Sequence, residues 1–504
     1  MPTSAHRSEF VAGAERLRGH VSGAALENLV LRLADGTLIV SPASLDSSTT
    51  YVVLEQGRWF EKEWSFVQKI ARDGMTIVDV GANAGVYSLA LARLAAPSGR
   101  VVAFEPSPEA RGRLLTGKVL NGADNLEVVD AALSSYEGAA VLTGGDGVQS
   151  ELGMIEATGS GIPVRVVTLD GEAVERQLTA IDFLKIDAEG AELSIISGGQ
   201  TVLANQTPLI MFEVTHAGEP SSSEVHVRLA EYGYALFRLV GPGTVLIPYD
   251  PQTPLDGSVL NLFAAKPDRA VSLESLGLLA RGPVLRSSYD PADVTADKAP
   301  FAASFEWRTD VSAPYLQALA AYGTWQSVGK PINDRVGALL WAYDALRVVC
   351  ANRPSVPKLC TLGRVAVDLG HNDVARQAFW GVVERVKSGA TALDEPFWPA
   401  SRRYDSLSPS PDPLEWFLAA VAEQIQLIHA FSSVFDTDGG ITPLSQWLLR
   451  TRYASDEMHR RNYLALLRKG TWMPLPSRLM ADTEDYLNAD LWRNGKVSPV
   501  LVKR

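Results

Sequence analysis

TIVDVGANAGVYSLALARL, residues 76–94, joins an apolar run to an Ala/Leu-rich segment through a turn that contains Gly81, Asn83 and Gly85. The apolar run predicts a buried strand, whereas the leucines and alanines of 89–94 predict a helix. A glycine-rich turn between a strand and a helix brings backbone close to whatever lies in the turn. This stretch therefore predicts a βα unit whose turn is a candidate ligand site.

The alternation of strands and helices continues downstream of this unit. Repeated βα units predict an α/β fold, with a mostly parallel sheet that is covered by helices on both faces. A small β element over 27–54 precedes it, and an aromatic-rich helix is expected over 57–73. The expected strands are 101–104, 126–129, 183–186, 209–212, 234–239 and 260–265, with helices over 108–120 and 191–197, and an extra β pair formed by 139–142 and 164–169 around a glycine-rich loop, 144–161.

The chain changes character after about residue 285. At 504 residues it is too long for one ordinary core, and nine of its eleven tryptophans follow this point. The segment 362–386 resembles a tetratricopeptide-type helix pair, so a C-terminal all-α domain is expected. The predicted division is 1–55 for the β element, 56–275 for the α/β domain, 276–300 for a linker and 301–504 for the helical domain.

Composition narrows the functional class. The net charge of −12 argues against a free-standing nucleic-acid binder, which would need clustered Lys and Arg. The two cysteines, Cys350 and Cys360, lack a metal-ligand spacing and suit a reducing compartment. The first thirty residues show no signal-peptide core, and no apolar run is long enough to cross a bilayer. We therefore expect a cytoplasmic protein without transmembrane segments.

Carboxylates stand at the ends of five successive predicted strands. In open α/β sheets, ligands bind outside the carboxyl ends of the strands, so these acids are expected on one edge. One acid at a strand end is commonly a helix cap or a turn former, but five at corresponding positions are poorly explained by capping alone. The five acids are Asp79, Glu105, Asp130, Asp187 and Glu213.

Glu105 narrows the choice of ligand. An acid at the end of the second strand, about 20 residues beyond a glycine turn, is placed to accept the ribose hydroxyls of a nucleoside. The dinucleotide fingerprint would need glycines where the chain has Asn83 and Val86, and the chain has no Gly-Lys-Ser/Thr phosphate loop. A nucleoside without pyrophosphate remains, and S-adenosylmethionine is the common one. Its amino-acid tail can meet the turn backbone, and carboxylates attract its sulfonium.

Five motifs together resemble the FkbM-type methyltransferases. They are DVGANAG (79–85), FEP (104–106), DAALS (130–134), IDFLKIDAEGAELSIISGG (181–199) and FEV (212–214). The resemblance covers about residues 50–265 and implies a Rossmann-like class I fold that uses S-adenosylmethionine. Members mostly methylate oxygen atoms of sugars, glycans or polyketide-type products. The loop 144–161 matches no motif, and the C-terminal half lies outside the resemblance.

The resemblance also implies residue roles. The cofactor-binding positions that it implies are Asp79, Gly81, Asn83, Gly85, Glu105, Pro106, Asp130 and Ala131. Asp187 and Glu213 end neighbouring strands and are expected to converge on the acceptor oxygen, where one of them would remove its proton. Lys185 would lie on the same side of its strand as Asp187. Glu189 either joins these acids or caps the following helix.

Several alternatives stay open. Asp187, Glu213 and His216 would make an oxygen-rich Mg²⁺ site that polarises a hydroxyl. The favoured hypothesis is an O-methyltransferase without a metal, acting on a sugar, a glycan or a related hydroxylated metabolite. A methyltransferase-fold assembly protein that works through its C-terminal helices is the first alternative, and those helices are also the candidate surface for a protein partner or self-association. A protein or RNA methyltransferase is the second, with the acidic charge weighing against RNA.

Overall fold

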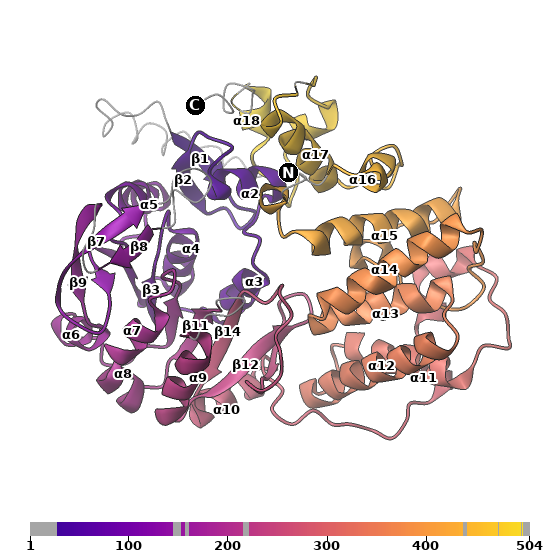
Figure 1. The fold of residues 1–504 in the computed structure, drawn as a ribbon, viewed down its shortest axis with the longest axis horizontal. Helices are drawn as coiled ribbons and strands as arrows, with labels where there is room; N and C mark the ends of the chain where they lie inside the picture. Colours follow the sequence, from indigo (N-terminus) through magenta and orange to yellow (C-terminus); the bar gives the residue numbers. More distant parts are fainter. Residues whose placement is uncertain are drawn as a thin grey trace. The chain divides into compact units, whose positions relative to one another are not determined.

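The computed structural model describes residues 28–144, 153–156, 161–214, 221–436, 441–471, 473–494 and 496. These residues form two compact units (Figure 1). The first unit comprises the described residues of 1–236, 260–269 and 463–504, and the second comprises 237–259 and 270–462. The chain therefore leaves the first unit and returns to it twice.

A mostly parallel sheet forms the centre of the first unit. The strand order is β13-β12-β14-β11-β10-β3-β4-β5, of which the six strands from β14 to β5 belong to this unit. Neighbouring strands are parallel from β11 through β10, β3 and β4 to β5, and β14 is antiparallel to β11. Their bounds are β3 (Thr76–Val80), β4 (Arg100–Phe104), β5 (Leu126–Val129), β10 (Phe183–Ile186), β11 (Leu209–Glu213) and β14 (Asn261–Ala265).

Helices cover both faces of this sheet. The chain runs outward from β3 to β5 through α4 and α5, and in the opposite direction from β10 to β11 through α7 and α8. Right-handed crossovers therefore place these two pairs of helices on opposite faces (Figure 1). The predicted Rossmann-like fold is confirmed. The helices of this part are α3 (Lys62–Ile70), α4 (Val86–Ala95), α5 (Pro108–Asn121), α6 (Leu169–Glu175), α7 (Glu192–Ser197), α8 (Gln200–Asn205) and α9 (Ser221–Glu231).

A second, four-stranded sheet in the order β6-β9-β7-β8 is inserted between β5 and β10. Its strands are β6 (Ala132–Leu133), β7 (Gly138–Gly144), β8 (Gly153–Glu156) and β9 (Ile162–Val167). The predicted extra β pair corresponds to β7 and β9, which are antiparallel. The predicted loop 144–161 also contains β8, and its remaining central residues lie outside the described part of the chain.

The N-terminal element differs from the expected all-β segment. Strands β1 (Asn28–Arg32) and β2 (Leu38–Pro42) form an antiparallel hairpin, but helix α2 (Ser48–Gln56) follows within the segment predicted as extended. Ser47 begins this helix by accepting the Thr50 N–H at 3.2 Å, and Gly57 ends it in a left-handed conformation. The β-branched residues of this segment are accommodated because the helix is buried along nearly its whole length.

The C-terminal segment returns to this N-terminal element. The Asn488 side chain accepts the Arg32 N–H at 2.8 Å and donates to the Arg32 carbonyl at 2.7 Å. The hydroxyl of buried Tyr486 donates to the Leu54 carbonyl at 2.8 Å. Residues 463–494 thus complete the first unit, and the predicted division of the chain into 56–275 and 301–504 stays a prediction. This segment contains η6 (Ser477–Met480) and α18 (Ala489–Arg493).

Helices build the second unit. In the predicted helix pair, Gly370 ends α13 in a left-handed conformation, and Phe379 of α14 packs where Gly363 of α13 has no side chain. Kinship with tetratricopeptide repeats stays a prediction. The unit contains β13 (Val245–Pro248), α11 (Ala313–Gln326), α12 (Ile332–Asn352), α13 (Val356–Leu369), α14 (Asn372–Lys387), α15 (Pro413–His429), α16 (Pro443–Leu448) and the short helices η1 (Pro291–Asp293), η2 (Ala296–Lys298), η3 (Pro300–Ser304), η4 (Arg402–Asp405) and η5 (Ser433–Phe435), while β12 (Ala235–Val240), α10 (Pro267–Ser275) and α17 (Asp456–Arg468) cross the unit boundaries along the sequence.

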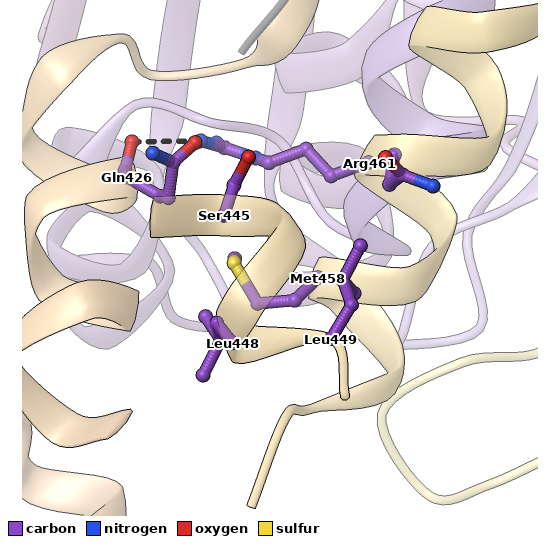
Figure 2. A pocket seen from close by; sticks show the side chains of 7 residues that line it. Gln426, Ser445, Leu448, Leu449, Met458 and Arg461 are labelled. Atoms are coloured by element: carbon purple, nitrogen blue, oxygen red, sulfur yellow. Dashed lines mark hydrogen bonds between the residues drawn. The ribbon is translucent and has the colours of Figure 1, made fainter. Parts of the chain in front are cut away.

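A small cavity of about 20 Å³ lies in the second unit, between α15, α16 and α17 (Figure 2). Ser445, Met458 and Arg461 are among its lining residues. The Arg461 guanidinium donates to the Gln426 carbonyl at 2.8 Å. This volume holds about one water molecule, so the cavity is too small for a substrate. None of the helices in the described part of the chain has the length and apolar character needed to cross a bilayer.

Candidate active site

The turn after β3 has a left-handed backbone at three positions. Gly81, Asn83 and Gly85 all have positive φ angles, of 76°, 48° and 88°. A side chain on Gly81 would lie 1.7 Å from the carbonyl oxygen of Asp187, and one on Gly85 would lie 2.3 Å from Leu114. Contacts within the protein therefore already require both glycines, because the turn packs against the loop after β10 and against α5.

Glu105 holds this turn in place. Its two carboxylate oxygens accept the backbone N–H groups of Asn83 and Ser107, each at 2.7 Å. The side chain is only 6% exposed, and burial raises the pKa of its carboxyl to about 6. Each carboxylate oxygen has a second lone pair, so these bonds leave acceptor capacity for a ribose hydroxyl.

Three further predicted cofactor-binding residues differ in their contacts and exposure. They are Pro106, which follows Glu105, and Asp130 and Ala131, which follow β5. Pro106 offers its carbonyl to Arg111 at 3.0 Å, and Arg111 also forms an ion pair with Asp130 at 2.7 Å. The Asp130 side chain is 66% exposed, whereas Ala131 is fully buried. Asp130 therefore remains at the edge of the turn region and does not join the other strand-end acids through these contacts.

Two buried acceptors in this region lack hydrogen-bond donors among the described residues. They are Oδ1 of Asn83 and Oδ1 of Asp79, which lies 3.6 Å from the Lys185 ammonium, while the other Asp79 oxygen accepts the Ser88 hydroxyl at 2.5 Å. Buried acceptors normally accept hydrogen bonds, so both oxygens have capacity for a further donor. S-adenosylmethionine carries an ammonium group and ribose hydroxyls as donors. The acceptors Asp79, Asn83 and Glu105 therefore fit this cofactor.

Lys185 lies between Asp79, which precedes the turn, and Asp187 at the end of β10. Its ammonium lies 2.7 Å from Asp187 and 3.6 Å from Asp79, and the side chain is 3% exposed. Burial favours the neutral amine, but the carboxylates of Asp187, Asp79 and Glu61 outweigh it and raise the pKa of Lys185 above its usual value. Lys185 is thus a buried cation beside Asp187, as the strand alternation predicted.

Asp187, Glu189 and Glu213 form an acidic cluster, with one oxygen of each within 4.8 Å of the others. The parallel register that pairs Ile186 with Phe212 brings Asp187 next to Glu213. Burial, followed by the charge of Asp187, raises the pKa of Glu213 to about 9 and that of Glu189 to about 7. Glu189 can therefore release its proton near neutral pH, whereas Glu213 keeps its proton there.

Glu189 does not cap the following helix. Helix α7 begins at Glu192, which is buried and accepts the N–H groups of Ala188 and Gly190 at 3.2 and 3.3 Å. Glu189 itself adopts a left-handed backbone with φ of 51°, which is uncommon for a residue with a side chain. This loop conformation turns the Glu189 carboxylate toward the acidic cluster. Of its two expected roles, the structure gives Glu189 the place beside Asp187.

Three neighbours of this site were not predicted from the sequence. The Tyr87 hydroxyl donates to the Glu61 carboxylate at 2.6 Å, and the Asn261 amide lies 3.4 Å from the same oxygen. Burial, followed by the charge of Asp187, raises the pKa of Glu61 to about 7. Glu61 precedes α3 and Asn261 begins β14, so no motif or strand-end rule pointed to either.

A divalent cation is the other species that this cluster could bind. Asp187, Glu189 and Glu213 each offer one oxygen at compatible separations. The alternative ligand set also contained His216, which lies outside the described residues. Carboxylates at such distances are common without an ion, so the geometry alone does not favour metal binding.

Comparison with known proteins agrees with this geometry. The family profile of the methyltransferase FkbM domain matches residues 79–236. The chain carries an FkbM methyltransferase domain. The 31-O-demethyl-FK506 methyltransferase FkbM of Streptomyces tacrolimicus is 27% identical over 195 residues, which cover 33% of this chain and 74% of that protein. The methyltransferase sdnD of Sordaria araneosa is 27% identical over 196 residues, which cover 32% of this chain and 74% of that protein.

The FkbM domain is an S-adenosylmethionine-dependent methyltransferase domain. A methyltransferase FkbM of Methylobacillus flagellatus, of known structure, is 17% identical and covers 38% of this chain and 44% of its own, with a TM-score of 0.27. The turn, Glu105 and the acidic cluster all lie within the matched residues 79–236, whereas Glu61 and Asn261 lie outside them.

Proposed function

We propose that the FkbM domain transfers a methyl group to a hydroxyl of a sugar, a glycan or a related metabolite. The observation that carries this proposal is the position of Asp187, Glu189 and Glu213 beside the cofactor turn at the carboxyl ends of β10 and β11. The name of the Streptomyces relative, a 31-O-demethyl-FK506 methyltransferase, supports an oxygen acceptor. When bound, S-adenosylmethionine supplies an activated methyl group.

The chain's own residues would position the acceptor and take its proton. Asp187 is 29% exposed, so a hydroxyl that reaches it from solvent can donate a hydrogen bond to its carboxylate. As the acceptor oxygen is methylated, a carboxylate of the cluster would take its proton. The pKa of about 7 at Glu189 suits such a base near neutral pH, whereas Glu213, with a pKa of about 9, would accept the proton at higher pH.

The proposed function is tested with a panel of mono- and oligosaccharides, incubated with the full-length protein and S-adenosylmethionine and analysed by mass spectrometry. A product heavier by one methyl group, absent when the protein is heat-inactivated, is expected for at least one acceptor. Asp187→Asn serves as the matched inactive variant because it keeps the side-chain shape and removes the charge. Methylation of an amine or a protein instead would contradict the hydroxyl acceptor.

We also propose a cytoplasmic location and a protein-binding or self-associating role for the helices of the second unit. Both cysteines are free and buried, which suits a reducing compartment. Light scattering of the full chain, and fractionation of cells that express it, test these two points. A monomer without partners would contradict the proposed role. Recovery of the protein outside the cytoplasm would contradict the proposed location.

A further inference from the structure

The Lys185 ammonium has three donors and few places to direct them. Asp187 lies at 2.7 Å, Asp79 lies at 3.6 Å, and the ring of Tyr87 faces the ammonium with its centre 5.1 Å away. This distance is within the range of a cation–π contact. Because Lys185 is 3% exposed, bulk water contributes little to its solvation. The position of the ammonium therefore depends on Asp187, Asp79 and the Tyr87 ring.

The Tyr87 ring is itself held from two sides. Its hydroxyl donates to the Glu61 carboxylate at 2.6 Å, and Trp64 meets the ring edge-on, with 5.1 Å between ring centres. The Asn261 amide lies 3.4 Å from the same Glu61 oxygen and so favours one orientation of that carboxylate. These contacts fix both the tilt and the depth of the ring beneath the ammonium.

Asp187 needs such support because it lies among other carboxyl groups. Glu189 and Glu213 are its neighbours in the acidic cluster, and the Lys185 ammonium lies within hydrogen-bond distance of it. A displaced ammonium would leave Asp187 free to turn away from these carboxylates.

We infer that Tyr87 and Glu61 are positioning residues, which hold Lys185 against Asp187 and thereby orient Asp187 toward the acceptor. The inference rests on the proposed function for its effect on turnover. Glu61 and Asn261 lie outside the residues matched by the family profile, so part of this support comes from segments that flank the matched residues. Neither Tyr87 nor Glu61 is required to touch the substrate.

The test compares the full-length protein with Tyr87→Phe, Glu61→Gln and the double variant. Tyr486→Phe is the matched control, because it removes a buried tyrosine hydroxyl that donates to a backbone carbonyl elsewhere in the first unit. The first readout is acetylation of individual lysines by acetic anhydride, followed by mass spectrometry. Lys358, a buried lysine paired with Glu395, is the internal reference. The second readout is kcat and KM with S-adenosylmethionine and the best acceptor from the saccharide panel.

We expect Tyr87→Phe and Glu61→Gln to raise acetylation of Lys185 several-fold, while acetylation of Lys358 and the KM for S-adenosylmethionine stay unchanged. Misplacement of Asp187 should lower kcat about tenfold in either variant. Since both residues act through one ring, the loss of kcat in the double variant should be no greater than the loss in the more impaired single variant.

Unchanged Lys185 acetylation in both single variants would overturn the inference, as would an equal loss of kcat in Tyr486→Phe. Additive losses in the double variant would overturn it as well. If Tyr87→Phe fails to fold, Glu61→Gln alone decides the question. If no saccharide is methylated by the wild type, the proposed function fails, but the acetylation readout still decides whether Tyr87 and Glu61 hold Lys185.

Discussion

Substitution of Glu105 by Gln is expected to weaken cofactor binding through two effects. Both oxygens of Glu105 accept backbone N–H groups at 2.7 Å, from Asn83 and from Ser107. A glutamine has only one acceptor oxygen, so its NH₂ group would face one of these N–H donors whichever way the amide is turned. The turn would therefore shift, and a carboxylate acceptor for the ribose would be lost.

The expected size of the effect follows from the bonds involved. A hydrogen bond to a charged group contributes about 1.5–3 kcal/mol, so its loss should weaken affinity about 10- to 100-fold. Titration calorimetry with S-adenosylhomocysteine measures this for the wild type, Glu105→Gln and Glu105→Ala. Glu105→Ala removes the ribose acceptor without placing a donor against the turn, so Glu105→Gln should bind no better than Glu105→Ala.

The pH dependence provides an independent check. The pKa of Glu105 is raised to about 6, and a donated ribose hydrogen bond favours the ionised carboxylate. Wild-type affinity should therefore rise between pH 5 and pH 7 (~ one unit either side of the pKa) and then level off, whereas the Gln variant should lack this rise. Equal affinities for wild type and Glu105→Gln at pH 7 would refute the role of Glu105.

Three further expectations follow from the site and the fold. Asp187→Asn and Glu213→Gln should lower turnover by about 10²–10⁴ while changing affinity for S-adenosylhomocysteine little, and near wild-type turnover would remove them as bases. Wild-type turnover should rise with pH as Glu189 and Glu213 lose protons, with pKa values of about 7 and 9. Turnover should also be unaffected by EDTA. Loss of turnover with EDTA and its recovery with Mg²⁺ would favour the metal alternative. Asn488→Ala should destabilise the protein by about 1–3 kcal/mol, because it removes both hydrogen bonds between the Asn488 side chain and the Arg32 backbone, and an unchanged melting temperature would contradict this.

The main sheet could be predicted from the sequence because its strands are short apolar runs between turns. The alternation of periods identified β3, β4, β5, β10 and β11 within about a residue. Parallel register then placed Asp187 beside Glu213, since residues that follow paired strand ends must be neighbours. Helix α2 was missed because its β-branched residues favour strands in isolation, and burial against the rest of the unit overrides that preference.

Other features depend on contacts between distant parts of the chain. Gly81 was expected to make room for a ligand, yet the carbonyl of Asp187 already excludes a side chain there. Glu61 reaches the site from the start of α3, and Asn488 bonds to a residue 456 positions earlier. Local periodicity carries no signal for such contacts.

One experiment distinguishes hydroxyl methylation from the alternatives. The full-length protein is incubated with S-adenosylmethionine labelled with ¹³C in its methyl group and with the saccharide panel, and the product is examined by NMR. We expect a single new methoxy carbon whose long-range couplings connect it to a ring carbon of the sugar, and its absence with Asp187→Asn. An N-methyl or C-methyl signal, or label recovered on protein or RNA instead, would contradict the account.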